Sequence, residues 1–182
     1  MGQVTTPQPV KLIVSVFGRA ERFDEVERAL VAQYGAIDWR SERLPFDHTH
    51  YYEREFGGGL ERVLYTFEAL IDPGDLPDIK LWTNDLEQRW AAEGQRTVNL
   101  DPGYVSAAKL VLATTKNHGH RIYLSKGIYA EVTLSYRDKA FRPLPWTYPD
   151  YGSVSYIAMM HEIRRRYRAQ LKARVRATPR SG

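Results

Sequence analysis

The 182-residue sequence contains no cysteine and no long apolar run. The missing cysteines exclude disulfides, thiolate catalysis and zinc or iron–sulfur sites with cysteine ligands. No apolar stretch approaches the roughly 18 residues that a membrane-spanning helix needs. The N-terminal segment MGQVTTPQPVK also lacks the basic and apolar regions of a secretion signal. These absences, with ordinary apolar (43%) and charged (26%) fractions, predict a cytoplasmic globular protein without a membrane partner.

Charge is unevenly distributed along the chain. The whole sequence has a formal net charge of +4 and a pI of about 9.3. Residues 161–182 carry eight Lys or Arg against one acid, which leaves 18 basic and 21 acidic residues in residues 1–160. The basicity therefore belongs to the C-terminus, and any nucleic-acid binding is expected there and not over the whole domain.

The motifs of the common nucleotide-binding folds are missing. The sequence has neither the phosphate-binding GxxxxGK[ST] loop nor the dinucleotide-binding GxGxxG pattern. In TKNH (residues 115–118), no Asp follows two residues after the lysine, as a guanine-reading element would require. These absences argue against a classical nucleotide-binding fold and leave open a nucleotide pocket of another kind.

The first part of the chain predicts a strand, a helix and a second strand. Residues 11–17 (KLIVSVF) are β-branched and almost continuously apolar, which is typical of a strand buried on both faces. Apolar residues then recur at helical spacing over residues 23–34, and Gly35 provides a stop. Residues 37–44 read as the second strand.

The rest of the chain predicts further strands, an intervening helix and a final helix. After the triple glycine Gly57–Gly59, a strand is favoured over a helix for residues 60–67, and a helix is expected from Pro77 to Gly94. A final helix is expected after Ser153 as its N-cap. The remaining strands are expected at residues 97–100, 110–114, 121–124 and 128–136.

We therefore predict a single α+β domain over residues 1–182. Its sheet is expected to be mixed or antiparallel, with two flanking helices and a long C-terminal helix. Residues 1–9 should form a loose lead-in, and residues 173–182 a frayed basic tail.

Reactive side chains concentrate between Asp101 and Glu131. Residues 114–121 (TTKNHGHR) combine two hydroxyls, two cations and two imidazoles around one glycine. Such a set can hold a phosphate or carboxylate and move a proton. The simpler alternative is a polar hairpin loop.

Two carboxylates in this stretch are open to two interpretations. Asp101 begins Asp-Pro-Gly-Tyr, which predicts a tight turn, or places a base or metal ligand at a strand end. Glu131 interrupts an apolar strand, and alternation places it on the face shared by Tyr129 and Thr133. If that face is exposed, Glu131 is solvated. If the face is covered, the carboxylate needs a partner or a metal.

A metal site is one further possibility. His118 and His120 would share a strand face, and with Asp101 or Glu131 they could form a two-His-one-carboxylate site for a divalent metal ion. The pair His48 and His50 raises the same possibility. Residue spacing alone does not bring these groups together, so the metal stays unassigned.

Other residues outside this stretch are secondary candidates. Lys80 and Asn84 lie four apart and would share a helix face that could look toward the site. The segment RPLPWTYPDYG offers aromatic rings that could stack on a ligand or close the core. The remaining secondary candidates are Arg54 and Arg62 among the cations, and Trp146, Tyr148 and Tyr151 among the aromatics.

Several short motifs carry a resemblance to a known family. The strings VNLDPGY, LATTK, HRIYL, KGIYAEVTL and WTYPDY, in this order, resemble a bacterial family catalogued as domain of unknown function 4416. The resemblance extends from PVKLIV near the start to the last helix. It implies no established activity, although some members are labelled GTP-binding. The run Gly57–Gly59 is longer than in the family pattern, and His48 is absent from that pattern.

Two functional hypotheses of different classes follow, and whether the protein is an enzyme stays open. In the first, the protein binds or converts a phosphorylated or nucleotide-like small molecule. Lys116 and Arg121 would hold its anion, and His120 would act as general acid or base. The carboxylates of Asp101 and Glu131 would orient groups or a divalent ion. Further ligand contacts would come from Thr115, Tyr104 and Tyr129.

The second hypothesis is a non-catalytic RNA- or ribosome-associated module that uses the basic C-terminal helix. A scaffold or protein-interaction domain is a third reading.

Overall fold

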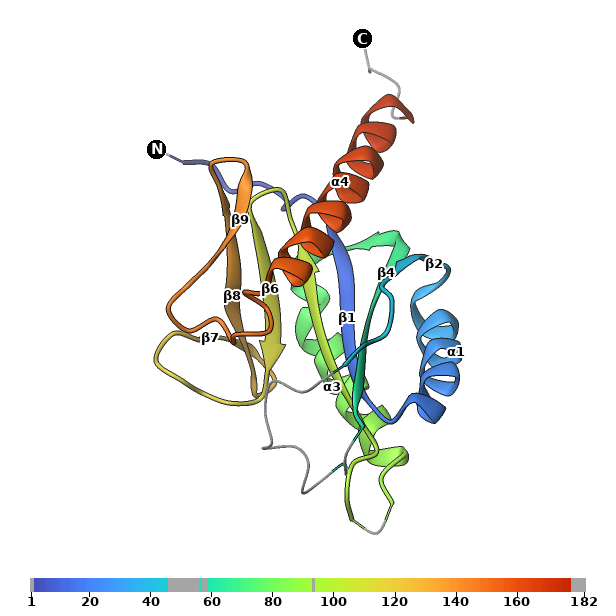
Figure 1. Cartoon of the computed structure of the whole chain (residues 1–182). Coiled ribbons are helices and arrows are strands. Elements are labelled where there is room, and N and C mark those ends of the chain that lie inside the picture. Colours follow the sequence, from blue (N-terminus) through green and yellow to red (C-terminus); the bar gives the residue numbers. More distant parts are fainter. Residues whose placement is uncertain (1, 46–55, 57–58, 93, 178–182) are drawn as a thin grey trace.

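The structure is a computed structural model that describes residues 2–45, 56, 59–92 and 94–177. Within these residues, nine strands form one open antiparallel sheet with three α-helices packed on it (Figure 1). The helices are α1 (Phe23–Tyr34), α3 (Leu76–Arg89) and α4 (Val154–Ala177). The strands are β1 (Val10–Gly18), β2 (Ile37–Arg40), β3 (Leu44–Pro45), β4 (Glu61–Ile71), β5 (Val98–Val105), β6 (Lys109–Thr114), β7 (Ile122–Ser125), β8 (Ile128–Arg137) and β9 (Ala140–Pro143).

The sheet has the strand order β2-β4-β1-β5-β6-β8-β7, with β3 also pairing β4 and β9 also pairing β8. Every residue of β1 is buried, as its continuous apolar pattern predicts for a strand covered on both faces. The expected strand–helix–strand opening is confirmed, but the second strand ends at Arg40, Leu44 belongs to β3, and β4 lies between β1 and β2. The α+β class and the long C-terminal helix are also confirmed, and the sheet is antiparallel.

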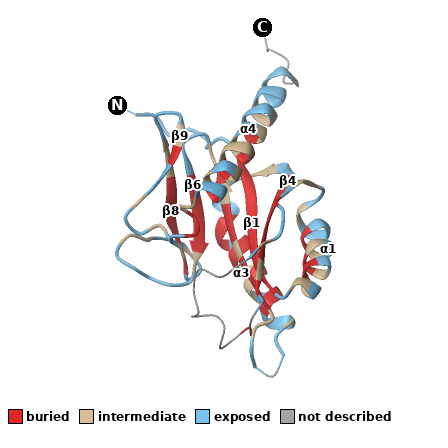
Figure 2. Ribbon diagram, in the orientation of Figure 1, coloured by how far each residue is buried: buried red, intermediate tan, exposed pale blue. Residues whose placement is uncertain are grey.

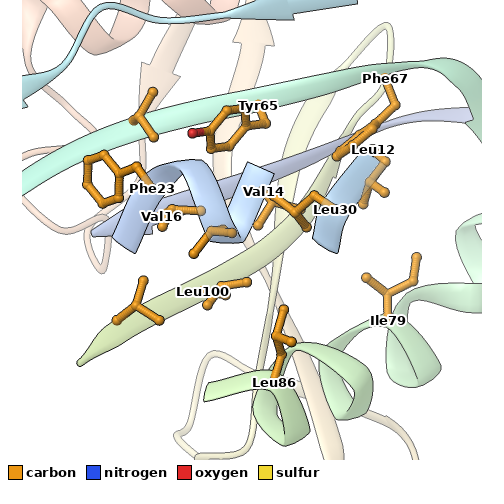
Figure 3. Packing of buried hydrophobic residues seen from close by; sticks show 13 residues of the cluster. Leu12, Val14, Val16, Phe23, Leu30, Tyr65, Phe67, Ile79, Leu86 and Leu100 are labelled. Carbon is orange, nitrogen blue, oxygen red and sulfur yellow. The ribbon is translucent and has the colours of Figure 1, made fainter. Parts of the chain in front are cut away.

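The two faces of the sheet are covered by different helices. Leu12, Val14 and Val16 of β1 point to one face, where they pack with residues of α1 and α3 (Figure 3). Ile13 points to the opposite face, where it packs with Met160 and other residues of α4. Buried residues accordingly concentrate in the central strands and on the inner sides of the helices (Figure 2). The result is a layered structure with the sheet in the middle.

The last helix begins as expected. Ser153 Oγ accepts a hydrogen bond from the Tyr156 N–H at 3.3 Å, so Ser153 caps the helix. The helix is described as far as Ala177, and the frayed tail expected at residues 173–182 stays a prediction. In the described chain, no helix is both long enough and apolar enough to cross a membrane.

One local prediction is wrong, and the difference matters for the site. The segment Asp101-Pro102-Gly103-Tyr104 is not a tight turn but the middle of β5. The chain stays extended there because β5 pairs with β1 along its whole length, from Val98 to Val105. This pairing continues across the Pro-Gly step, so Asp101 lies on a strand and its side chain has a defined direction.

Candidate functional site

A cavity opens where two neighbouring strands part. The strand β5 pairs with β6 at only three positions, from Gly103 to Val105. Residues 98–102 keep β1 as a partner, while the end of β6 leads away from them. The space between holds a cavity of about 680 Å³, which we call the wedge cavity. It lies between Asn99 and Asp101 of β5 and residues 112–116, and α3, β4, β8 and the segment after β9 complete its wall.

The sequence Asp-Pro-Gly sets the point at which the strands join. A Cβ on Gly103 would lie 2.3 Å from the Val111 carbonyl oxygen and 2.6 Å from Leu112 Cδ2. Only glycine therefore permits this close approach of β5 to β6. Pro102, one residue earlier, has no N–H to donate, and the pairing with β6 begins only after it. Proline is tolerated because that side of β5 has no neighbouring strand there.

Side chains of α3 take the place of the missing strand. The Leu100 N–H donates to Glu87 Oε1 at 2.6 Å, and the Leu100 carbonyl accepts from Lys80 Nζ at 2.9 Å. In a complete sheet, a neighbouring strand would satisfy both groups. Lys80, Asn84 and Glu87 follow one another at helical spacing, and all three line the wedge cavity. A polar row of α3 thus forms one wall.

Glu87 is the most strongly desolvated carboxylate of this wall. It is 5% exposed, and burial raises its pKa above the ordinary value, although Lys80, the Leu100 N–H and Arg96 favour the charged form. Arg96 lies 3.3 Å from Glu87 and donates to Asn99 Oδ1 at 2.7 Å, and Asn99 Nδ2 donates to Asp101 Oδ2 at 2.8 Å. The chain of contacts ends at Asp101, whose side chain is 32% exposed and whose other oxygen lies 3.7 Å from Lys80 Nζ.

The opposite wall contains a second, tighter ion pair. Arg121 Nε donates to Glu131 Oε2 at 2.8 Å, and both side chains are about 5% exposed or less. Thr133 donates to the other Glu131 oxygen at 3.3 Å. Arg121 also donates to the Lys116 carbonyl at 3.1 Å, so it holds the chain that leaves β6. The face of β8 that bears Glu131 is therefore covered, and its carboxylate has the partner that burial requires.

His120 lies behind this ion pair and does not line the wedge cavity. Its Nε2 is 3.2 Å from Glu131 Oε2, and its ring is stacked between His118 and Trp146, with centroid distances of 6.0 and 5.2 Å. Proton transfer by His120 to a ligand in the cavity would have to pass through Glu131. The described residues contain no group of three His, Asp or Glu that could hold a metal ion, so the two-His-one-carboxylate site is not found there. His48 and His50 lie outside the described residues.

The segment of residues 144–153, which we call the strap, runs from β9 to α4 and is anchored on two strands, β8 and β4. At its start, Trp146 Nε1 donates to the Val132 carbonyl at 2.9 Å, which fixes it to β8. At its end, Asp150 forms an ion pair with Arg62 of β4. Between these anchors Tyr148, 56% exposed, forms part of the cavity wall. The strap therefore places an aromatic ring beside the charged groups.

The structure brings most of the predicted site residues together. Asp101, Thr115, Lys116, Arg121 and Glu131 all line the wedge cavity, as do the secondary candidates Arg62, Lys80, Asn84, Tyr148 and Tyr151.

Other predicted residues lie elsewhere. Tyr104 points to the α3 side of the sheet, where it packs on an apolar cluster and burial raises its pKa. Tyr129 packs edge-on against Tyr123, with 5.4 Å between the ring centroids. Neither tyrosine lines the cavity, nor does Trp146. Arg54 is outside the described residues.

Sequence reasoning missed Glu87, Arg96, Asn99 and Asp150. Two of them carried a usable signal. Glu87 continues the helical spacing of Lys80 and Asn84, and Asn99 precedes Asp101 by two, which places both on one strand face. No local pattern indicates Asp150, because its position depends on where the strap meets β4.

Comparison with known proteins gives a family and nothing more. Residues 8–167 match the model of a family described as a domain of unknown function (DUF4416). Comparisons with curated proteins and with solved structures gave no match.

Proposed function

This chain belongs to the DUF4416 family, and we propose that it binds a phosphorylated or nucleotide-like small molecule in the wedge cavity. The family description assigns no activity, so the proposal rests on the site. Its volume of about 680 Å³ suits a small ligand, since such pockets measure about 300–1,000 Å³. One observation carries the proposal: a lysine that no described carboxylate pairs with and a partly open carboxylate face the same cavity.

The lysine is Lys116, which we assign to the anionic group of the ligand. The buried carboxylates of the wall have cationic neighbours in Arg62, Arg96 and Arg121. In the described part of the chain, no carboxylate pairs with the exposed Lys116 ammonium. An ammonium with three open donors at the rim of a cavity attracts a phosphate or carboxylate. The hydroxyl of Thr115, which also lines the cavity, adds a further donor.

The carboxylate is Asp101, which we assign to the N–H or O–H groups of the ligand. Asn99 Nδ2 donates to one of its oxygens at 2.8 Å. Lys80 Nζ is 3.7 Å from the other oxygen, which is too far for a hydrogen bond, so this oxygen can accept one from a ligand. The Asn84 side chain lines the same wall and can donate or accept. Tyr148 offers an exposed ring face for a base or sugar ring. A molecule with an anion at one end and hydroxyl or ring N–H groups at the other matches this arrangement.

The cavity wall also holds a group suited to proton transfer. Burial raises the pKa of Glu87, which brings a carboxyl closer to the range in which it can accept and return a proton. We propose binding as the function and Glu87, before His120, as the residue to examine for chemistry.

Thermal shift measurements with inorganic phosphate, nucleoside mono- and triphosphates and sugar phosphates test the proposal. A probe at about a hundred times its dissociation constant should add about 2.7 kcal/mol to the free energy of unfolding. Lys116→Ala should abolish the shift for phosphorylated probes. Asp101→Asn should reduce it for nucleotides and leave inorganic phosphate unaffected.

The chain offers matched controls for both variants. Lys109 is an exposed lysine at the other end of β6, and Asp85 is an exposed aspartate of α3, and neither lines the cavity. Lys109→Ala and Asp85→Asn should keep the full shift. The proposal is wrong if no probe stabilises the wild-type protein, or if the controls lose as much of the shift as the cavity variants.

A further inference from the structure

The C-terminal part of α4 extends past the body of the protein. Tyr167 is buried, no residue of this helix from 168 to 176 is buried, and residues 172–176 are all exposed. Figure 1 shows this end continuing beyond the central strands, and Figure 2 shows it in the exposed colour. An unpacked helical segment gains little stability in water, so packing on the body does not account for these last turns.

Basic residues of this helix follow one face. The steps of three, four and four residues between Arg165, Arg168, Lys172 and Arg176 place them in a row, which we call the basic stripe. All four are exposed. Helical geometry puts this row opposite the residues that pack on the sheet, which are Tyr156, Met160, Ile163 and Tyr167. The stripe therefore faces away from the body.

The other bases of α4 have structural partners. Arg164 donates to the Ala107 carbonyl at 2.8 Å, and its guanidinium lies 3.5 Å from the centre of the Tyr136 ring. Arg166 donates to Glu162 and to the Asp38 carbonyl. These two residues dock the helix on the body. Of the stripe, Arg165 pairs with Glu162 while remaining 68% exposed.

The remaining three stripe residues have no acidic partner among the described residues. In the part of the chain that the structure describes, no carboxylate pairs with Arg168, Lys172 or Arg176. Residues 1–160 carry three more acids than bases, so the stripe is a positive surface on a slightly negative body. This separation of charge favours a polyanionic partner that contacts the helix and not the body.

We propose that the basic stripe binds the phosphodiester backbone of a nucleic acid. The row spans about 16 Å at 1.5 Å per residue, which is enough for several successive phosphates. It presents cations and no side chain typical of base reading, so binding is expected to be independent of sequence. An anionic membrane fits less well, because Ala169 and no large apolar side chain lies between the bases on the stripe face, and the exposed Val175 lies to one side of it. The proposal does not depend on the wedge cavity.

Fluorescence anisotropy with the full-length protein tests this inference. The probes are a labelled polyuridylate, a mixed-sequence DNA duplex and, in a separate assay, phosphatidylserine vesicles. Four contacts to a single strand give a slope of about −3 for log K against log salt concentration, at about −0.7 per phosphate. Arg168→Glu/Lys172→Glu should weaken nucleic-acid binding more than tenfold and make this slope shallower by at least about 1.4.

The matched control is Arg28→Glu/Arg89→Glu, which changes the net charge equally at exposed positions of α1 and α3. It should retain the affinity and the salt slope. Stronger binding of polyuridylate would identify RNA as the partner, and stronger binding of the duplex would identify DNA. The inference is overturned if wild-type protein binds neither at low salt, if only the vesicles bind, or if the control loses as much affinity as the stripe variant.

Discussion

Among the described residues, two groups of buried charged side chains differ in how completely their partners surround them. The first surrounds Lys11, a residue of β1 whose side chain is fully buried. Its ammonium donates to Asp38 Oδ2 at 2.7 Å, the Phe67 carbonyl at 2.9 Å and Gln170 Oε1 at 2.9 Å. Three donors meet three acceptors, and Thr66 donates to the remaining Asp38 oxygen at 2.6 Å.

The second group lines the wedge cavity, where the same kinds of side chain enclose a hollow. Its inner members are paired as well, for example Arg121 with Glu131. Its outer members are not saturated, since Asp101 keeps one oxygen 3.7 Å from Lys80. We call the group around Lys11 the closed cluster and the group that lines the wedge cavity the hollow cluster. The closed cluster has no hydrogen-bonding groups left for another molecule, whereas the hollow cluster does. Unsatisfied hydrogen-bonding capacity beside a cavity, and not buried charge itself, therefore marks a candidate site.

The closed cluster has a clear structural task. Lys11 belongs to β1, Asp38 to β2 and Gln170 to α4, so one ammonium ties the last helix to two strands. Gln170 adds a bond of 2.8 Å to the Glu68 carbonyl. Burial lowers the pKa of Lys11, while Asp38 favours its charged form. Such a group stabilises the fold only while its partners remain.

The largest effect in this comparison is expected from Lys11→Met. The substitution keeps the volume but leaves Asp38 and two other acceptors without their donor. We expect a loss of about 3 kcal/mol in the free energy of unfolding, as for other broken buried pairs. Urea denaturation followed by far-UV circular dichroism measures it.

The control for this prediction is the double variant Lys11→Met/Asp38→Asn, which also removes the uncompensated negative charge. It should recover part of the stability. Equal stability of wild type and Lys11→Met would show that the closed cluster does not hold α4. If the folded Lys11→Met variant no longer bound the phosphorylated probes of the thermal shift assay, the two clusters would not differ in function.

An intermediate effect is expected from Gly103→Ala, at the point where β5 joins β6. The new Cβ would lie 2.3 Å from the Val111 carbonyl oxygen, so the two strands must separate. We expect a loss of about 1–3 kcal/mol, the usual range for overpacking, together with weaker probe binding because the cavity changes shape. Thermal denaturation and the probe assay measure both. Gly119→Ala is the control, since nothing lies within 4 Å of its Cβ and no change is expected. Unchanged stability and probe binding in Gly103→Ala would contradict the role assigned to the point where β5 begins to pair with β6.

The sequence predicted much of the fold because its patterns are local. The continuous apolar run of β1, the helical spacing in α1 and the Ser153 cap each depend on neighbouring residues alone. The turn predicted at Asp101 is wrong because Pro-Gly favours turns locally, while pairing with β1 holds the segment extended. Tertiary pairing overrode a local preference there.

The site was predictable in composition and not in geometry. Residues 114–121 and Glu131 stood out because polar groups interrupt apolar strands, and Arg121 and Glu131 do meet in the cavity wall. The position of His120 behind Glu131 could not be predicted from the sequence, because the His120 ring is placed by its stacking against Trp146 of the strap. Asp150 could not be predicted for a similar reason, since its partner Arg62 is 88 residues away in the sequence.

The smallest effect, and the most informative about the hollow cluster, is expected from Glu87→Gln. Burial raises the folded-state pKa of Glu87 above its unfolded value. The folded protein therefore binds the proton more tightly, and the stability contributed by this group is present below about pH 4.5 and lost as the pH rises through the folded-state pKa.

At pH 7 the ionised Glu87 costs stability, which glutamine avoids while its amide oxygen still accepts the Leu100 N–H. Glu87→Gln should therefore leave stability almost unchanged at pH 4.5 and raise it at pH 7, by about 1.4 kcal/mol for each unit of the pKa shift. Urea denaturation of both proteins between pH 4 and 8 measures the difference. A variant that is equally destabilised at both pH values would mean that Glu87 belongs with the saturated, purely structural groups. A gain at pH 7 would identify it as a group held at a cost to folding, as residues of functional sites often are.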